Sequence, residues 1–286
     1  MTAGARLREL LAGEALVVAP GAYDCLTARI VEQAGFPVVY MTGAGTAASL
    51  GYPDYGLVTM SEMAANAARI AAAVAAPVIA DADTGFGNEL NVVRTVREYA
   101  AAGVAALHIE DQVFPKRCGH LDGKQVIEAG EFVSKVRAAA ENRPDPDLVL
   151  IARTDARAVL GFEEAVERAN RALQAGADVA FVEAPQTPEE LADVPRRVEG
   201  PCLLNVVAGG KTPDISLPQA AELGYRLAIV PVLVLAAVLA AGDAALAGLA
   251  ATGRHPDAVP VIGPEQIFQR VGAGGWDDVR ARYGVD

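Results

Sequence analysis

The sequence predicts an α/β protein built as a single (βα)8 barrel of the TIM type, with a helical extension at its C-terminus. Three observations predict this fold: short apolar runs of strand length alternate with Ala-rich segments of helical period, the runs number eight, and no Pro-, Gly- or Ser-rich linker divides the 286 residues. Such barrels have roughly 250 residues. We therefore expect one domain over 1–286, with the extension at about 254–286. A doubly wound open sheet is the alternative, but it usually has fewer strands.

The eight predicted strands are short and aliphatic. Hydrophobic residues make up 52% of the chain and aromatic residues 5%, so Ala, Val, Leu and Ile must fill the core, as in buried parallel strands and the helices that cover them. In chain order the predicted strands are Leu16–Ala19, Val38–Met41, Val78–Asp81, Ala105–Ile109, Leu148–Ala152, Val179–Glu183, Cys202–Val206 and Leu227–Pro231.

The segments between the strands carry helix signals at both ends. Thr59 with Glu62, and Thr187 with Glu190, have the spacing of capping boxes, and Pro188 occupies the first position of the second helix. Glycines suited to the left-handed conformation that ends a helix follow three of the predicted helices: Gly35, Gly103 and Gly176.

Charge and cysteine content limit the partners and the compartment. The chain has 24 Lys and Arg against 36 Asp and Glu, a net charge of −12, which excludes nucleic acid and anionic membranes but not a small anionic substrate. Three cysteines without C-x-x-C spacing predict neither a disulfide nor a zinc site and fit the cytoplasm. The uncharged stretch Leu227–Gly242 is shorter than the ~20 residues of a spanning helix and contains Pro231, so we expect no membrane span. Arg6 and Glu9 interrupt any signal-peptide core near the N-terminus.

The barrel prediction requires reactive residues to follow the strand ends, because active sites of such barrels lie at the carboxyl ends of the strands. The sequence meets this requirement at six of the predicted strands. The polar stretches are Tyr40–Gly45, Asp81–Gly87, His108–Gln112, Arg153–Asp155, Glu183 and Asn205.

Three acidic residues at neighbouring strand ends predict a metal site. Asp81, Asp83 and Glu110 supply hard oxygen ligands, and no His or Cys cluster competes with them, so we expect Mg²⁺ or Mn²⁺. The alternative is that each acid caps a helix or pairs with an arginine such as Arg153. Three carboxylates on one rim are costly without a cation, which favours the metal.

The loop Gln112–Gly130 is too long for an ordinary βα connection and is expected to be a lid. Lys116, Arg117 and His120 surround Cys118 in this loop, and their field is expected to lower the pKa of the thiol toward neutrality. The alternative is a solvated basic loop with an incidental cysteine. Elsewhere on the rim, Arg153 is suited to a two-pronged bond to a carboxylate.

The motifs Asp81–Gly87, His108–Gln112 and Lys116–His120, in that order, resemble the isocitrate lyase/phosphoenolpyruvate mutase superfamily. The resemblance covers nearly the whole chain, and the Lys116–His120 motif is similar to that of the lyases rather than the mutases. It implies a (βα)8 barrel and Mg²⁺ held largely through waters by the three acids. It also implies a homotetramer of dimers that exchange a C-terminal helix, here Pro264–Tyr283.

The resemblance also implies a role for each site residue. The carboxylate of the 2-oxo acid half would be held by Tyr40, Thr42, Gly43 and Ala44, with help from Asp54 and Arg153. The other half would be lined by Glu183 and Asn205. As the lid closes, Lys116, Gly119 and His120 would settle on the substrate. Cys118 would be the proton carrier, and Tyr40 is the candidate base toward the substrate hydroxyl.

The implied activity is Mg²⁺-dependent retro-aldol cleavage of a 2-hydroxy di- or tricarboxylate, of the 2-methylisocitrate or 2,3-dimethylmalate type, to a 2-oxo acid and a second carboxylate. Chain length resembles the methylisocitrate lyase branch. The stretch Val206–Pro213 is more similar to dimethylmalate lyases and oxaloacetate hydrolases, whereas Pro231 resembles the lyases more than the hydrolases.

Three alternatives remain open on the sequence. Two are enzymes of the same superfamily: an oxaloacetate hydrolase or decarboxylase, and a phosphonate-forming mutase. The third is a vestigial barrel that binds a dicarboxylate without turnover. The complete set of acids, cysteine, histidine and arginine speaks against the vestigial barrel, because a lost function should have cost at least one of them.

Overall fold

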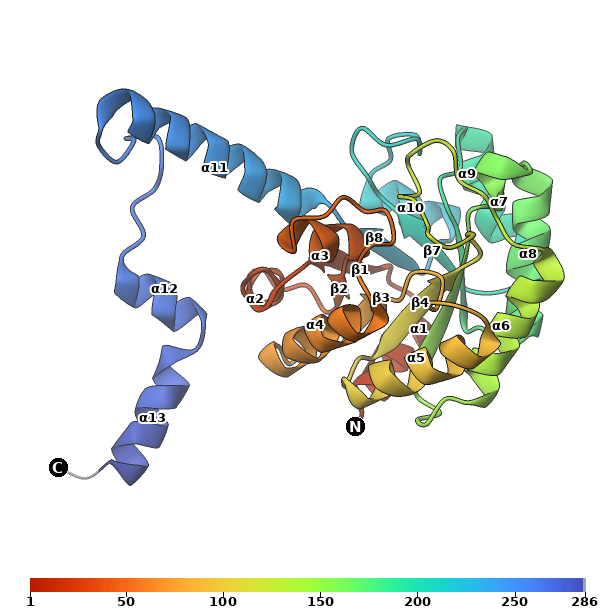
Figure 1. The fold of residues 1–286 in the computed structure, drawn as a ribbon, viewed down its shortest axis with the longest axis horizontal. Coiled ribbons are helices and arrows are strands. Elements are labelled where there is room, and N and C mark those ends of the chain that lie inside the picture. The colour runs from red at the N-terminus through yellow and green to blue at the C-terminus, as the bar shows by residue number, and fades with distance from the viewer. Residues whose placement is uncertain (285–286) are drawn as a thin grey trace. The chain divides into compact units, whose positions relative to one another are not determined.

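Eight parallel strands close into a barrel in the computed structural model, which describes residues 1–284 (Figure 1). Each strand pairs with the next, and β8 pairs with β1, so the (βα)8 prediction is confirmed and the open sheet is excluded. The strands are β1 (Val17–Ala22), β2 (Val39–Met41), β3 (Val78–Asp81), β4 (Ala106–Glu110), β5 (Val149–Thr154), β6 (Val179–Val182), β7 (Cys202–Asn205) and β8 (Leu227–Val230).

The predicted strands agree with the observed ones to within two residues at each end, except at the first. There the strand continues through Pro20 and Gly21 to Ala22, beyond the predicted end at Ala19. The backbone of Pro231 explains the glycine: a Cβ at Gly21 would lie 2.6 Å from the Pro231 carbonyl carbon. Gly21 therefore belongs to the strand because it allows the close approach of the chain that follows β8.

Ten helices lie between the N-terminus and β8, and they surround the barrel. Their bounds are α1 (Ala3–Ala12), α2 (Cys25–Gln33), α3 (Gly43–Ser49), α4 (Met60–Ala73), α5 (Glu89–Ala101), α6 (Ala129–Glu141), α7 (Ala156–Val159), α8 (Phe162–Gln174), α9 (Pro188–Arg197) and α10 (Leu217–Leu223). The predicted helix-ending glycines all have positive φ angles: +88° at Gly35, +80° at Gly103 and +108° at Gly176.

One of the two predicted capping boxes is present. At the start of α4 the Thr59 hydroxyl accepts from the Glu62 amide, and the Glu62 carboxylate accepts from the Thr59 amide. At α9, Thr187 caps the Glu190 amide, but the Glu190 side chain binds Arg157 instead, so this second box is wrong. An ion pair with a charged partner has displaced the weaker reciprocal bond.

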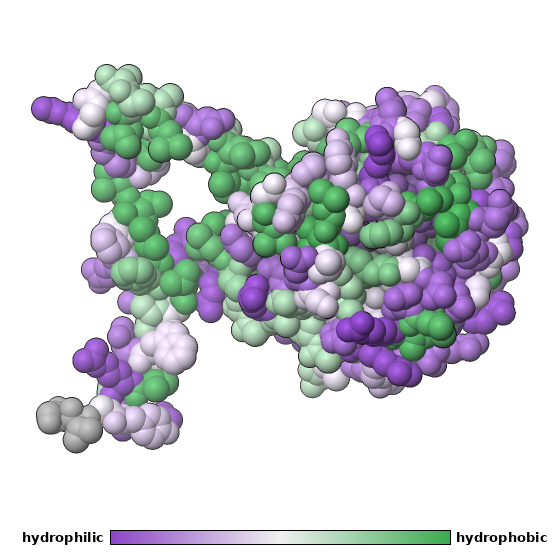
Figure 2. All heavy atoms as spheres, viewed as in Figure 1, coloured by the Kyte–Doolittle hydropathy of each residue, from purple (hydrophilic) through white to green (hydrophobic). Residues whose placement is uncertain are grey.

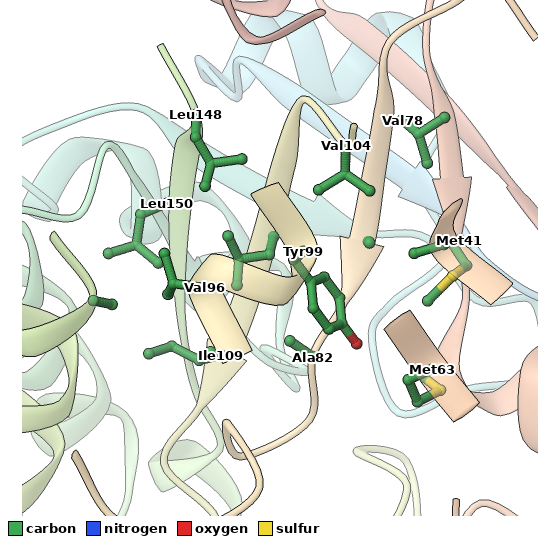
Figure 3. Packing of buried hydrophobic residues seen from close by; sticks show 14 of the residues in the cluster. Met41, Met63, Val78, Ala82, Val96, Tyr99, Val104, Ile109, Leu148 and Leu150 are labelled. Atoms are coloured by element: carbon green, nitrogen blue, oxygen red, sulfur yellow. The ribbon is translucent and has the colours of Figure 1, made fainter. Parts of the chain in front are cut away.

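The hydrophobic core has two layers, one inside the barrel and one between the strands and the helices. On β2 the side chains alternate between them: Tyr40 belongs to the inner layer and Met41 to the outer one. Figure 3 shows part of the outer layer, with Tyr99 of α5 directed toward the strand end at Ala82. The Tyr99 hydroxyl donates to the Asp81 carbonyl at 2.8 Å. This bond fixes the end of β3 at the mouth of the barrel.

The chain divides into two compact units, Met1–Val234 and the residues from Leu235 onward. The division falls earlier than the expected extension at 254–286, of which residues 285–286 lie outside the described part. The second unit contains most of α11 (Leu233–Thr252), followed by α12 (Pro264–Arg270) and α13 (Ala273–Tyr283). The single C-terminal helix expected at Pro264–Tyr283 is thus two helices, separated at Gly272 with φ +92°.

Helix α11 has 20 residues, mean hydropathy 2.1 and no buried residue, and hydrophobic atoms lie along it in Figure 2. By length and composition it could cross a membrane. The apolar helix is therefore longer than the sequence argument allowed, and the expectation that it does not span a membrane stays a prediction. The sequence argument ended the apolar run at Gly242, whereas the helix continues through one charge, Asp243, to Thr252.

Candidate active site

The predicted polar residues gather at the carboxyl ends of the strands. Strand register places Asp81 beside His108 and Glu110 beside Arg153. Most of the rim is shielded from solvent, with fractional exposures of 5% for Asp81, 3% for Asp83, 1% for Glu110, 7% for Arg153, 1% for Glu183 and 7% for Asn205.

Asp81 is held as a carboxylate by hydrogen bonds from two backbone amides. Gly43 N–H donates to Oδ2 at 3.1 Å and Asp83 N–H donates to Oδ1 at 2.9 Å. Burial opposes ionisation, but neighbouring His108, Lys116 and Arg153 outweigh it and lower the pKa of Asp81. The Asp81 carboxylate can therefore accept a hydrogen bond from water or bind a cation.

The segment after β2 is organised around Asp81 as well. Thr42 caps α3 by accepting from the Gly45 amide. A Cβ at Gly43 would lie 2.9 Å from the Asp81 Cγ, so glycine is needed at this approach. The Gly43 amide donates to Asp81 in this structure, and its implied role toward a substrate carboxylate stays a prediction. The corresponding roles of Thr42 and Ala44 stay predictions.

Asp83 and Glu110 are carboxyl groups without enough partners. The Oδ1 atom of Asp83 and both carboxyl oxygens of Glu110 are buried and make no well-aligned hydrogen bond, although Lys116 and Arg153 lie within ion-pair distance of them. Burial, reinforced by neighbouring carboxylates, raises the pKa of Asp83 to about 6, and burial raises the pKa of Glu110 well above its ordinary value. Asp83 also has a left-handed backbone, φ +45°. Such strain is characteristic of functional positions.

These buried oxygens, which lack well-aligned hydrogen bonds, fit a hard divalent cation, which would replace the protons that burial favours. Within residues 1–284, however, no three His, Cys, Asp or Glu side chains converge closely enough to form a direct metal-ligand group. Mg²⁺ retains several of its waters, so the same acids can hold it through them. The donor set therefore fits water-mediated binding and not direct coordination by three acids.

The predicted lid is a long connection from β4 to α6 without a helix, closed at its base by a bridge between Gln112 and Val126. Lys116 reaches from the lid to the rim, where its Nζ lies 2.5 Å from Asp54 Oδ1 and 3.0 Å from Asp83 Oδ1. Burial opposes the charge of Lys116, but these carboxylates outweigh it and raise the pKa well above its ordinary value. Lys116 therefore acts as a fixed cation.

Cys118 differs from its prediction. Burial raises the pKa of the Cys118 thiol, whereas the sequence predicted that flanking cations would lower it. Lys116 and Arg153 do act to lower this pKa, but burial outweighs them, and the Arg117 guanidinium lies over the Tyr55 ring, 5.8 Å from the ring centroid. The thiol therefore keeps its proton at neutral pH. A protonated thiol suits a proton donor better than a nucleophile.

Arg153 is more committed than predicted. Its Nε and Nη2 both donate to Asp155, at 2.8 and 3.2 Å, so Asp155 occupies the two-pronged edge that was expected for a substrate. The same guanidinium lies 3.2 Å from Glu110 and 3.6 Å from Glu183, with Phe181 beneath it at 5.1 Å. Arg153 is thus a rigid cation at the centre of the rim.

His120 is oriented by the loop that follows β7. Lys211 N–H donates to Nδ1 at 3.1 Å, so the proton of a neutral ring resides on Nε2, which lies 3.4 Å from Glu183 Oε1. Burial lowers the pKa of His120, so the ring is neutral at pH 7. Asn205 donates to the other oxygen of Glu183 at 3.2 Å. The lid histidine and the predicted residues of β6 and β7 therefore meet.

Tyr40 does not fit the predicted base. Burial raises the pKa of its hydroxyl well above the ordinary value, with the charge of Asp81 adding to the effect. The hydroxyl lies 2.8 Å from His108 Nε2, in a buried polar group beneath the rim. Tyr40 therefore remains protonated and acts as a hydrogen-bonding group.

Sequence reasoning gave no role to Asp155, Lys124 or His108. The sequence placed Asp155 and His108 in the polar stretches at strand ends. Most of their hydrogen-bond and ion-pair partners come from other strands or from the lid, so residue spacing along the chain could not predict them. Lys124 lies within the lid outside any motif, and its side chain is 1% exposed. Its signal was a second lysine in a loop predicted to close over carboxylates.

Comparisons with known proteins agree with this geometry. Residues 7–250 match the family model described as phosphoenolpyruvate phosphomutase. The chain belongs to the phosphoenolpyruvate mutase/isocitrate lyase superfamily. It is 49% identical over 232 residues to 2,3-dimethylmalate lyase of Eubacterium barkeri, covering 81% of this chain and 80% of that protein. It is 47% identical over 254 residues to 2-methylisocitrate lyase of Aeropyrum pernix, covering 89% and 82%.

Solved structures of this superfamily have the same fold. Oxaloacetate acetylhydrolase in complex with 3,3-difluorooxalacetate matches with a TM-score of 0.95 and 39% identity, over 100% of this chain and 98% of that one. Phosphonopyruvate hydrolase in complex with oxalate and Mg²⁺ matches with a TM-score of 0.89 and 33% identity, over 99% of both chains. The superfamily thus includes both lyases and hydrolases with this barrel.

Proposed function

We propose that this protein is a carbon–carbon lyase that cleaves a 2-hydroxy di- or tricarboxylate, of the 2,3-dimethylmalate or 2-methylisocitrate class, to a 2-oxo acid and a second carboxylate. The observation that carries the proposal is the protonated thiol of Cys118, on a lid whose other side chains contact the buried rim. The two relatives that are 49% and 47% identical bear the names of such lyases.

The rim offers fixed positive groups to an anionic substrate. Lys116 and Arg153 are buried cations, and His120 presents its Nε2–H beside Glu183. Because these groups are already held by carboxylates, they are in place before the substrate arrives. A substrate carboxylate would exchange contacts with the acidic residues that now occupy these cations.

Cleavage starts with transfer of the proton of the C2 hydroxyl to solvent water, from which the Cys118 thiolate is later reprotonated. The C2–C3 bond then breaks: C2 becomes the carbonyl carbon of the 2-oxo acid, and the bonding pair moves to C3 as the enolate of the second carboxylate. Cys118 donates its proton to C3, and the hydroxyl proton balances the thiolate when the site resets. No redox partner is needed. Burial of the thiol keeps the proton available up to the donation step.

Asp81, Asp83 and Glu110 would hold Mg²⁺, or Mn²⁺, through waters. The bound ion would supply stabilisation of the negative charge that develops on the substrate oxygens. The support in this chain is the set of buried oxygens on Asp83 and Glu110 that lack well-aligned hydrogen bonds. In the same proposal Tyr40 donates a hydrogen bond and does not remove the hydroxyl proton.

A second candidate, hydrolysis of oxaloacetate, is favoured by the likeness to the oxaloacetate acetylhydrolase structure. A substrate panel separates the two. Purified protein is assayed with 2,3-dimethylmalate, 2-methylisocitrate, oxaloacetate and phosphonopyruvate, with Mg²⁺ and then with excess chelator. Release of a 2-oxo acid from a hydroxy acid supports the lyase. Release of oxalate and acetate from oxaloacetate, without lyase turnover, supports the hydrolase and refutes the lyase.

The role of Cys118 is tested by Cys118→Ser, with Cys25→Ser as the matched control on α2. General acid catalysis contributes roughly 10²–10⁴-fold, so Cys118→Ser is expected to lose at least about 100-fold in kcat on the hydroxy acid. Cys25→Ser should keep the wild-type rate. Wild-type turnover in Cys118→Ser would show that another group donates the proton.

We propose further that the protein assembles as a homotetramer of dimers, and that α11 packs against a second copy. A helix that is apolar all round requires burial, and α11 has none within one chain. Leu239 and Leu246 are 60% and 66% exposed, so Leu239→Glu with Leu246→Glu should shift the mass measured by light scattering toward the monomer. Sedimentation of the wild type with lipid vesicles, and not as an oligomer, would refute this.

The three free thiols fit a cytoplasmic location.

A further inference from the structure

Lys124 is a buried lysine of the lid that has no role in the chemistry proposed above. Its side chain is 1% exposed, and its ammonium group makes two short contacts. Nζ donates to Asp155 Oδ1 at 2.7 Å and to the Gly119 carbonyl at 2.5 Å. One charged group therefore joins the lid to the end of β5 and to the lid's own backbone.

The partner carboxylate is itself fully buried and shared. Asp155 also accepts both prongs of Arg153, and its own amide donates to Asp111 at 2.8 Å. Burial opposes the charge of Asp155, but Arg153 and Lys124 outweigh it and keep its pKa well below the ordinary value. If the lid lifted, Asp155 would lose one of its two counter-charges while still attached to the barrel. Removing one partner from a buried charge is strongly unfavourable.

The second partner, the Gly119 peptide, lies where the chemistry is proposed. A Cβ at Gly119 would lie 2.7 Å from Glu183 Cδ, and nearer still to the carboxylate oxygen and to Arg153. The peptide is thus pressed against the rim, between Cys118 and His120. A bond to its carbonyl fixes the backbone on which the thiol and the imidazole are carried.

We propose that Lys124 is a positioning residue that locks the lid closed, by bridging the Asp155 carboxylate and the Gly119 carbonyl, and so places the Cys118 thiol and the His120 ring over the substrate. The placement over substrate rests on the proposed function, whereas the lock itself does not.

Lys124 and Lys116 both attach the lid to the rim, but they bind different partners. Lys116 binds Asp83, a candidate metal-site acid, so its contacts depend on what occupies that site. The partners of Lys124 are Asp155 and a backbone carbonyl, neither of which belongs to the candidate metal acids. The lock therefore holds the lid before metal or substrate binds.

The test compares Lys124→Met with wild type in the full chain without substrate. The rate of alkylation of Cys118 by iodoacetamide is measured by peptide mass spectrometry, relative to Cys25 in the same sample; both residues are partly exposed in this structure. The matched control is Asp122→Asn, which removes the lid's exposed ion pair with Lys211; Asp122 is 95% exposed. Lys124→Arg tests rescue by a second cation.

Lys124→Met is expected to raise the Cys118:Cys25 ratio by about tenfold or more, because the buried ion pair no longer opposes opening. Asp122→Asn should leave it unchanged, and Lys124→Arg should restore part of the protection. In activity assays Lys124→Met should raise KM and lower kcat/KM by about 100-fold, since a displacement of about 1 Å at the site can cost that much.

Two results would overturn the lock. A ratio within twofold of wild type in Lys124→Met would show that the lid does not depend on this lysine. Faster alkylation of buried Cys202 as well would show general loosening of the barrel and not a local role. If the ratio rises as expected in a protein that turns over no hydroxy acid, the lock stands and the proposed function fails.

Discussion

Gly119→Ala tests whether the lid closes as tightly as the structure indicates. The added Cβ would lie 2.7 Å from Glu183 Cδ, whereas ordinary contacts begin at 3.4 Å. The lid must therefore retreat by at least 0.7 Å, and by more to clear the nearer carboxylate oxygen and the Arg153 guanidinium. The obstacle cannot simply swing away, because Glu183 is fixed by Asn205 and Arg153.

A displacement of about 1 Å in a catalytic group can cost roughly 100-fold in rate, which corresponds to about 2.7 kcal/mol. We expect Gly119→Ala to lose about that factor in kcat/KM, measured on whichever hydroxy acid the substrate panel identifies. The thermal midpoint should fall little, since the lid can lift while the barrel stays folded. The control is Gly130→Ala, where a Cβ meets nothing within 4 Å. More than half the wild-type activity in Gly119→Ala would refute the closed lid.

Three further predictions concern the metal acids and the thiol. The affinity for Mg²⁺ should weaken as pH falls below about 6, because the pKa of Asp83 is raised to about 6 and its protonated form must release a proton before Mg²⁺ binds. Calorimetry in two buffers measures the affinity and the proton release. Equal affinity at pH 5 and pH 7 would contradict the prediction. Gly43→Ala, whose Cβ would lie 2.9 Å from Asp81 Cγ, should weaken Mg²⁺ binding by about tenfold or more. The control Gly130→Ala should leave Mg²⁺ binding unchanged. Unchanged Mg²⁺ affinity in Gly43→Ala would show that Asp81 is not part of the metal site. The alkylation rate of Cys118 should rise with pH around a midpoint above the ordinary thiol value, and a midpoint near neutrality would restore the lowered pKa expected from the sequence.

The fold could be predicted because each level of the sequence agreed with the others. Apolar runs, helix caps and helix-ending glycines are local signals, and all eight strands were placed from them. The failures have a common cause in tertiary contacts. The first predicted strand stopped at Ala19, before Gly21, which allows the approach of Pro231, and Glu190 leaves its predicted cap for Arg157. Local patterns cannot reveal a partner that another part of the chain provides.

The position of the site could be predicted from the sequence, but the protonation states of its residues could not. Residues at strand ends are brought to one rim by the topology, so Asp83, Glu110 and Glu183 could be grouped from sequence alone. Their protonation states could not be predicted, because these depend on burial more than on sequence neighbours. Cys118 shows this most clearly: three flanking basic residues suggested a lowered pKa, but burial raises it. The flanking cations instead face carboxylates or aromatic rings.

The charge of the rim explains why an acidic protein can be proposed to bind an acidic substrate. Among the described residues, six carboxyl groups surround three cations at this rim: Asp54, Asp81, Asp83, Glu110, Asp155 and Glu183 around Lys116, Lys124 and Arg153. Burial raises the pKa of both Asp83 and Glu110, so protonation reduces this excess as the pH falls toward 6. A divalent cation would take the place of those protons and cancel the charge that would repel a carboxylate. Substrate binding should therefore require the metal, and calorimetry with excess chelator should detect no binding of the hydroxy acid. Binding of undiminished affinity under chelation would show that the cations alone suffice.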